Sequence, residues 1–236
     1  MILTASYSNI GGRDCNEDTV KLVADGADRC CTVLADGLGG HGGGAQASAA
    51  VAETICALWQ NQQEKPDLEN MIQCAHQEVL KLQSASCFMK STVVALCLRP
   101  GVAQWAHVGD SRLYYFYNGS LTFQSRDHSA SQIAVMLGDI TPDQIRFHAD
   151  RNRVLRALGQ DGDLLVETNE QPLLAGQHAF LLCSDGFWEY VLEQEMEQDL
   201  SASADPDEWL RRMRRRLQKR IPSDNDNNSA AAVWVV

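Results

Sequence analysis

Short apolar runs recur along the chain and predict a series of β-strands. They cover residues 31–35, 92–99, 102–108, 111–117, 178–183 and 230–236. Two of the gaps between runs are tight turns, at Arg99-Pro100-Gly101 and at Asn118-Gly119. Asn-Gly accepts the positive φ angles of a two-residue hairpin turn. Successive hairpins of this kind predict antiparallel sheet.

Three other segments have apolar residues at helical spacing. A helix over 45–62 is predicted by Val51, Ile55 and Trp59, and 67–83 repeats the pattern. Asp205-Pro206, a capping residue followed by proline, predicts the start of a third helix that runs to about Lys219. The first two helices follow each other with no strand between them. This order argues against βαβ units and favours an α+β fold with antiparallel sheets.

Composition narrows the classes of protein that remain. The 236 residues, with 20 Lys and Arg against 31 Asp and Glu and a net charge of −11, predict one globular domain over 1–236. That charge argues against nucleic acid as a partner, and no apolar run reaches the ~20 residues of a membrane span. The amino terminus lacks a secretory pattern, so a cytoplasmic location is expected.

The cysteines and the basic residues are expected to be structural. The eight cysteines form no C-x-x-C pair and are expected to be reduced thiols, mostly buried. The basic stretch 211–220 lies on the third helix, where a solvated outer face is the simplest interpretation. The six histidines do not cluster in the sequence, and His107 is expected to be a packed imidazole rather than a ligand.

Candidate chemistry lies where apolar strands run directly into an aspartate beside a glycine. The three cases are Asp36-Gly37, Gly109-Asp110 and Asp185-Gly186. A carboxylate at the end of a buried strand is costly unless it is compensated, and several together repel each other unless a cation lies between them. With Glu17-Asp18 and Asp226, they favour an acidic cluster. Oxygen ligands without His or Cys suit Mg²⁺ or Mn²⁺ rather than zinc.

Arg13 adds a group that the acids lack. Its planar guanidinium can bind a phosphate through two parallel hydrogen bonds. More than three or four converging acids indicate two ions, which is a common means of activating a water for attack on phosphorus. The sequence therefore predicts metal-assisted hydrolysis of a phosphate ester.

At these residues the chain resembles the protein phosphatase 2C family. Five motifs occur in that family's order across residues 6 to 236. They are Arg13-Asp-Cys-Asn16-Glu17-Asp18, Asp36-Gly-Leu-Gly-Gly-His41, Val108-Gly-Asp110-Ser-Arg112, Ser184-Asp185-Gly186 and Asp226-Asn227-Asn-Ser229. The resemblance implies a four-layer α–β–β–α sandwich of two antiparallel sheets flanked by helix pairs. It also implies a metal site in a cleft at one edge of the sheets.

The resemblance also implies a role for each site residue. One Mg²⁺ or Mn²⁺ ion would be held by Asp36, Asp185 and Asp226, and a second by Glu17, Asp36 and the carbonyl of Gly37. Asp110, with Asp185, matches a weaker third metal site of bacterial members. Asp18 would hydrogen-bond a metal-bound water, and Arg13 would bind the substrate phosphate.

The implied reaction is attack on phosphoserine or phosphothreonine by a hydroxide bridging two Mg²⁺ or Mn²⁺ ions. The implied partners are phosphorylated proteins and a cognate Ser/Thr kinase, with the protein acting as a monomer. The chain departs from eukaryotic members in having Leu38 where they have a histidine that protonates the leaving alcohol; His41 follows three residues later. Residues 130–153 resemble the segment where the family inserts a flap near the active site, with Thr141-Pro142 as a helix stop.

Two alternatives remain beside the phosphatase. The segment 37–42 matches the G-x-G-x-x-G pattern of a dinucleotide-binding oxidoreductase, although Asp36 would repel a pyrophosphate and no βαβ unit follows. The other alternative is a catalytically silent phosphatase-like protein that acts by binding. Such a protein is expected to have lost at least one metal-binding acid, whereas this chain keeps each acid that the motifs place.

Overall fold

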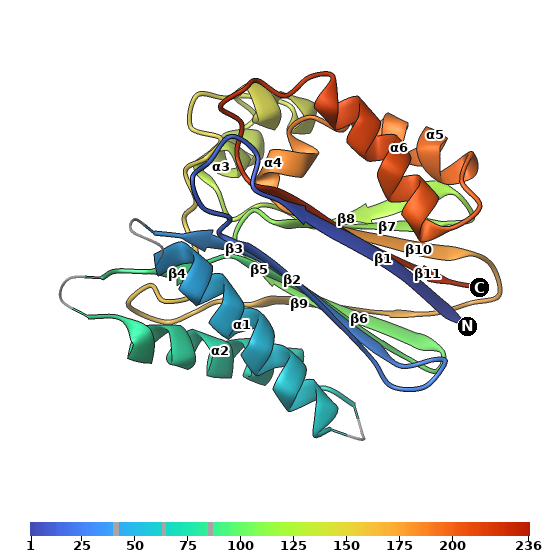
Figure 1. Ribbon diagram of the computed structural model, residues 1–236, viewed down its shortest axis with the longest axis horizontal. Coiled ribbons are helices and arrows are strands. Elements are labelled where there is room, and N and C mark those ends of the chain that lie inside the picture. Colours follow the sequence, from blue (N-terminus) through green and yellow to red (C-terminus); the bar gives the residue numbers. More distant parts are fainter. Residues whose placement is uncertain (40–42, 63–64, 85–86) are drawn as a thin grey trace.

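The computed structural model describes residues 1–39, 43–62, 65–84 and 87–236. Two antiparallel sheets stack face to face, and helices cover the outer face of each (Figure 1). The first sheet has the order β1 (Ile2–Asn9), β11 (Asn228–Val235), β10 (His178–Cys183), β7 (Arg112–Tyr117) and β8 (Ser120–Gln124). The second has the order β2 (Asp18–Ala24), β3 (Cys30–Leu38), β5 (Val93–Arg99), β6 (Val102–Val108) and β9 (Glu167–Pro172), with β4 (Lys90–Ser91) paired to β3.

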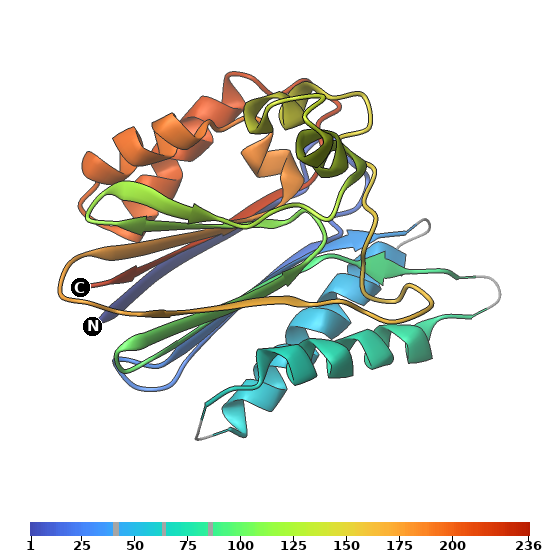
Figure 2. The ribbon, with the colours of Figure 1, turned by 180° about the vertical axis from the view of Figure 1, so that it is seen from behind.

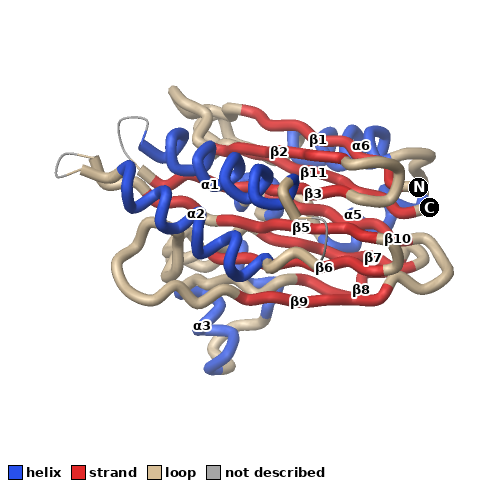
Figure 3. Tube along the Cα trace, turned by 90° about the horizontal axis from the view of Figure 1, so that it is seen from below, coloured by secondary structure: helices blue, strands red, loops and turns tan. Residues whose placement is uncertain are grey.

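The helices divide between the two outer faces, as seen from both sides of the molecule (Figures 1 and 2). The second sheet is covered by α1 (Gly43–Gln60) and α2 (Leu68–Leu82), which cross its strands obliquely (Figure 3). The first sheet is covered by α4 (Asp185–Trp188), α5 (Glu193–Ser201) and α6 (Pro206–Gln218). A short helix α3 (Ala130–Leu137) and the 3₁₀ helix η1 (Pro142–Phe147) lie at one end of the sandwich. The predicted four-layer architecture is confirmed.

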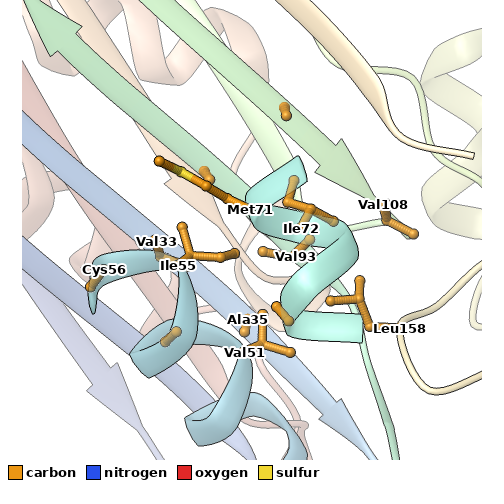
Figure 4. Close-up of a cluster of buried hydrophobic side chains, with 14 of the residues drawn as sticks. Val33, Ala35, Val51, Ile55, Cys56, Met71, Ile72, Val93, Val108 and Leu158 are labelled. Carbon is orange, nitrogen blue, oxygen red and sulfur yellow. The ribbon is translucent and has the colours of Figure 1, made fainter. Parts of the chain in front are cut away.

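Three hydrophobic layers hold the four structural layers together. Strand β5 shows how, because successive side chains of a strand point to opposite faces. Val93, Ala95 and Cys97 pack against α1 and α2, whereas Val94 and Leu96 pack between the sheets. Figure 4 shows Val93 in the first of these layers, with Val51 and Ile55 of α1 and Met71 and Ile72 of α2. A strand buried on both faces needs an unbroken apolar run, which explains why this segment lacks the alternation of a half-exposed strand. A third layer lies between the first sheet and α4 to α6.

One predicted turn, at Asn118-Gly119, is present in the structure, whereas one predicted helix end differs. Asn118 and Gly119 both have positive φ, at 50° and 84°, as the β7–β8 hairpin requires. The expected helix stop at Thr141-Pro142 is wrong: α3 ends at Leu137 and is capped by Gly138, which adopts the left-handed conformation. Pro142 instead opens η1, where its missing N–H costs nothing.

The structure can be compared with three expectations, on the cysteines, on membrane-spanning helices and on the basic stretch. All eight cysteines are free thiols; five are buried, but Cys15 is exposed. No helix within the described residues is both long and apolar enough to cross a bilayer. The basic stretch 211–220 is not simply solvated, because Arg211, Arg212, Arg216 and Arg220 form ion pairs with acidic residues of the protein.

Candidate metal centre

The acidic residues singled out in the sequence meet at one end of the sandwich, where strands of both sheets end. Asp18 opens β2, Asp36 lies near the end of β3, and Asp110 occupies the turn between β6 and β7. Asp185 opens α4 directly after β10, and Asp226 precedes β11. A cleft of about 640 Å³ opens there, with Asp18 buried beside it. The cleft is lined by Arg13, Asp14, Cys15, Glu17, Asp36, Gly37, Leu38, Gly39, Asp110, Asn152, Val154, Asp185, Asp226 and Asn227.

Asp36 lies at the centre of this cluster. Burial raises its pKa well above the ordinary value, and the nearby carboxylates of Asp18, Asp185 and Asp110 raise it further. The pKa of Asp185 is raised in the same way, by burial and then by Asp110 and Asp226. Carboxylates that raise one another's pKa repel each other, and a cation bound between them would relieve that repulsion. A set of oxygen ligands with this much unbalanced charge fits hard divalent cations.

Glu17 is held against the amino-terminal end of α1. Its backbone N–H donates to Oδ1 of Asn227 at 2.8 Å, and its carbonyl accepts from Gly37 N–H at 3.0 Å. Burial raises the pKa of the Glu17 carboxyl, while the backbone N–H groups of Gly44 and Ala45 donate to it and lower that pKa. A Cβ at Gly44 would lie 2.6 Å from Cδ of Glu17, so only glycine fits there. The lack of a side chain at Gly44 therefore lets the amino-terminal end of α1 contact the Glu17 carboxylate.

Asp18 is supported from the other sheet. The hydroxyl of Ser184 donates to Oδ2 of Asp18 at 2.8 Å, and the backbone N–H of Ser229 donates to the Ser184 oxygen at 3.0 Å. Burial raises the pKa of Asp18 to about 6. Oδ1 of Asp18 has no hydrogen-bond partner within the part of the chain that the structure describes, and the same holds for Oδ2 of Asp110. Buried acceptors left unpaired fit a bound cation or an ordered water.

Arg13 lies at the mouth of the cleft. Its guanidinium donates to Oδ2 of Asp226 at 2.8 Å, and 55% of its side chain is exposed. The hydrogen bond and charge of Asp226 raise the pKa of Arg13, with smaller contributions from Asp185 and Glu17. One guanidinium nitrogen of Arg13 thus binds Asp226, and the remaining N–H donors are exposed at the cleft, where a phosphate can reach them.

Some residues of the site were not identified from the sequence. Asn227 donates from Nδ2 to the carbonyls of Ile10 and Cys15 and accepts from Glu17, so it ties the amino-terminal loop to the start of β11. Its position beside Asp226 in the last motif was the available signal. Asn152 and Val154 line the cleft from the segment after η1. His41, noted in the sequence, lies outside the described residues.

The histidines are less scattered than the sequence suggested. His107 and His128 stack with ring centroids 4.9 Å apart and planes 16° apart, and Nε2 of His128 lies 3.0 Å from Oε1 of Glu167. A metal ion lies in the plane of each imidazole that binds it, so two stacked rings cannot point at one ion. In addition, Nε2 of His107 donates to the carbonyl of Arg126 at 2.8 Å. His128 and Glu167 are thus joined by a hydrogen bond, and His107 stacks on His128 as a packed imidazole, as expected.

Comparison with known proteins links this geometry to a family. The family model described as protein phosphatase 2C matches residues 6–228. A serine/threonine phosphatase stp of Listeria monocytogenes serotype 4b is 32% identical over 197 residues, covering 79% of this chain and 78% of the relative.

Solved structures agree over almost the whole chain. PppA, described as a key regulatory component of T6SS in Pseudomonas aeruginosa, has a TM-score of 0.80 at 31% identity, with 98% of this chain and 96% of PppA covered. The catalytic domain of the serine/threonine protein phosphatase PstP, in complex with two manganese ions, has a TM-score of 0.82 at 25% identity. That match covers 100% of this chain and 99% of PstP.

Proposed function

Since this chain belongs to the protein phosphatase 2C family and is a metal-dependent protein serine/threonine phosphatase, we propose that the cleft around Asp36 is its active site. The observation that supports this most is that acids from five separate segments line one cleft beside an exposed guanidinium. Burial and neighbouring carboxylates raise the pKa of Asp36 and of Asp185 there. We further propose that residues 1–236 act as one catalytic domain.

The residues present fit two divalent cations, Mg²⁺ or Mn²⁺. Asp36, Asp185 and Asp226 would hold one ion, and Glu17, Asp36 and the carbonyl of Gly37 the other. Asp110, with Asp185, would hold a weaker third. Bound divalent cations neutralise charge on the phosphoryl group and lower the pKa of water, so that it attacks phosphorus at neutral pH.

The protein's own groups position the substrate and the water. The guanidinium of Arg13 binds the non-bridging phosphate oxygens and keeps the phosphoryl group at the cleft mouth. Asp18, fixed by Ser184, orients the attacking water through its unpaired carboxylate oxygen. As the water oxygen bonds to phosphorus, the ester P–O bond breaks, the serine or threonine oxygen leaves and takes a proton, and inorganic phosphate is released.

The proposed setting follows from charge and thiol chemistry. The eight free cysteines suit the reducing cytoplasm. The net charge of −11 disfavours nucleic acid as a partner. We expect the protein to act as a monomer on phosphoproteins that a cognate Ser/Thr kinase modifies.

The test is hydrolysis of an aryl phosphate and of a phosphothreonine peptide with Mn²⁺, with a chelator, and with Asp185→Asn. Both substrates should be cleaved only with the metal, and Asp185→Asn should lose the activity. A protein that binds phosphopeptide without cleaving it under any divalent ion would instead be the catalytically silent relative. Turnover that survives chelation would rule out the metal-dependent mechanism.

A further inference from the structure

The turn that carries Asp110 is held through its backbone. Gly109 has a φ of +105°, and a Cβ there would lie 2.7 Å from the side chain of Thr92, so the turn requires glycine. The Gly109 N–H donates to Nδ1 of His128 at 3.1 Å, and the Gly109 carbonyl accepts from the His128 N–H at 2.9 Å. On the other side, Nε1 of Trp188 donates to the Asp110 carbonyl at 2.9 Å.

The Asp110 carboxylate depends on this backbone for its direction. Asp110 is 2% exposed and lines the cleft, and its Oδ2 has no hydrogen-bond partner among the residues that the structure describes. A carboxylate that lacks strong side-chain partners keeps its orientation only as well as the main chain is fixed. Two side chains fix it here, and Trp188 is itself part of α4, which begins with Asp185.

The hydrogen bonds of His128 define its tautomer. Because Nδ1 accepts from Gly109, the single proton of the neutral ring is on Nε2, where it is donated to Glu167 at 3.0 Å. The carbonyl of His128 accepts from the N–H of Leu155 at 2.8 Å. His128 therefore connects three places: the Asp110 turn, the strand β9 that bears Glu167, and the segment 152–155 beside the cleft.

We propose that His128 is a positioning residue that sets the direction of the Asp110 carboxylate through the Gly109 N–H. This proposal rests on the proposed function, in which Asp110 helps to hold a divalent cation. His128 itself does not line the cleft. Loss of its Nδ1 acceptor frees the Gly109 N–H, and the turn can then rotate and turn the carboxylate from the cleft. Groups that orient metal ligands in this way are commonly worth 10- to 100-fold in metal affinity.

Two substitutions separate this role from simple packing. In His128→Asn, the amide oxygen takes the place of Nδ1 and keeps the acceptor for Gly109, while the contact with Glu167 is lost. In His128→Gln, the amide takes the place of Nε2, so that Glu167 keeps its partner while Gly109 loses its acceptor. Thermal unfolding in chelator reports on the fold of each variant apart from its metal binding.

The experiment is a titration of each variant with Mn²⁺, followed by calorimetry or by the paramagnetic signal of free Mn²⁺. We expect His128→Gln to weaken the weakest Mn²⁺ site about tenfold or more, and His128→Asn to stay within about threefold of wild type. In an Asp110→Asn background, His128→Gln should cause no further loss. Unchanged binding in His128→Gln, or equal losses in both variants, would overturn the proposal. Wild-type protein that binds no Mn²⁺ would overturn the proposed function itself.

Discussion

Asp18 and Asp36 are directly opposite each other in the β2–β3 ladder. Residues paired in this way project to the same face of a sheet, so two carboxylates are forced together where the ladder ends. Burial raises the pKa of both groups, that of Asp18 to about 6. Like charges opposite each other destabilise a sheet, so the protein without metal is less stable than it would be without this cluster. A bound cation can neutralise the cluster.

Asp36→Asn should therefore raise the stability of the metal-free protein and lower its activity. Removing the central charge should raise the free energy of unfolding in chelator by about 1 kcal/mol, which is a rise of roughly 2–4 °C in melting temperature. Phosphatase activity should fall more than about a hundredfold because Asp36 is the proposed shared ligand of two metal ions. Thermal unfolding with chelator and aryl phosphate hydrolysis with Mn²⁺ measure the two effects. Asp161→Asn, on an exposed loop, is the control; a less stable Asp36→Asn with full activity would contradict the assignment.

Divalent cations should stabilise the native protein in proportion to their binding. A ligand that binds only the folded state adds about 2.7 kcal/mol at a hundred times its dissociation constant. Melting temperature should thus rise steadily with Mn²⁺ or Mg²⁺ and return to its starting value on chelation. The same titration on Asp36→Asn should show a much smaller rise. A melting temperature that ignores both ions would indicate that the acids do not bind them.

Arg13 should affect binding of the phosphoryl group. One charge-assisted hydrogen bond is worth about 1.5–3 kcal/mol, so Arg13→Ala should lower kcat/KM by at least about 10- to 100-fold. Arg13→Lys, which keeps the charge without the planar fork, should recover part of this loss. Inhibition by inorganic phosphate should weaken in the same order. If Arg13→Ala left phosphate inhibition unchanged, the ion pair with Asp226 would be the residue's whole role.

The sequence predicted the buried strands and the acids but not the exposed elements. Strand β5 was clear because both of its faces are buried, whereas β9, with the sequence ETNEQP, is an edge strand of mostly exposed polar residues. Helix α3 buries only Ser131, and its apolar residues Met136 and Leu137 are exposed, so its apolar pattern does not mark a face packed on the core. The acids of the site were predicted because motifs mark them. The bond from Glu17 N–H to Asn227 spans 210 residues, and no local pattern encodes such a contact.

A network between α5 and α6 gives the protein a pH dependence unrelated to the metal centre. Glu195 receives hydrogen bonds from Arg216 at 3.0 Å and from Arg220 at 2.6 Å, and Arg216 also bonds Asp199. The hydrogen bond from Arg220 is the largest cause that lowers the pKa of Glu195, to about 2. The basic stretch on α6 thus ties two helices of the outer layer together.

Glu195→Gln should lower the stability of the protein near neutral pH but not in strong acid. A carboxyl whose folded pKa is below its unfolded value stabilises the fold at pH values above the unfolded pKa, which is 4.5 for Glu195. That stability is lost as the pH falls from about 5 towards 2, because the folded state must then bind the proton it excludes. With discounting for the partly exposed arginines, the loss at pH 7 should be about 2 kcal/mol.

Urea unfolding of wild type and Glu195→Gln at several pH values measures this difference. The gap should be largest above pH 5 and close as the pH approaches 2, whereas Glu78→Gln, which breaks an exposed pair on α2, should change little at any pH. Sodium chloride at 1 M should narrow the Glu195 gap only in part, since the carboxylate side chain is 12% exposed and poorly screened. A gap that stayed constant down to pH 2 would show that Glu195 stabilises the helix pair by packing and not by its charge.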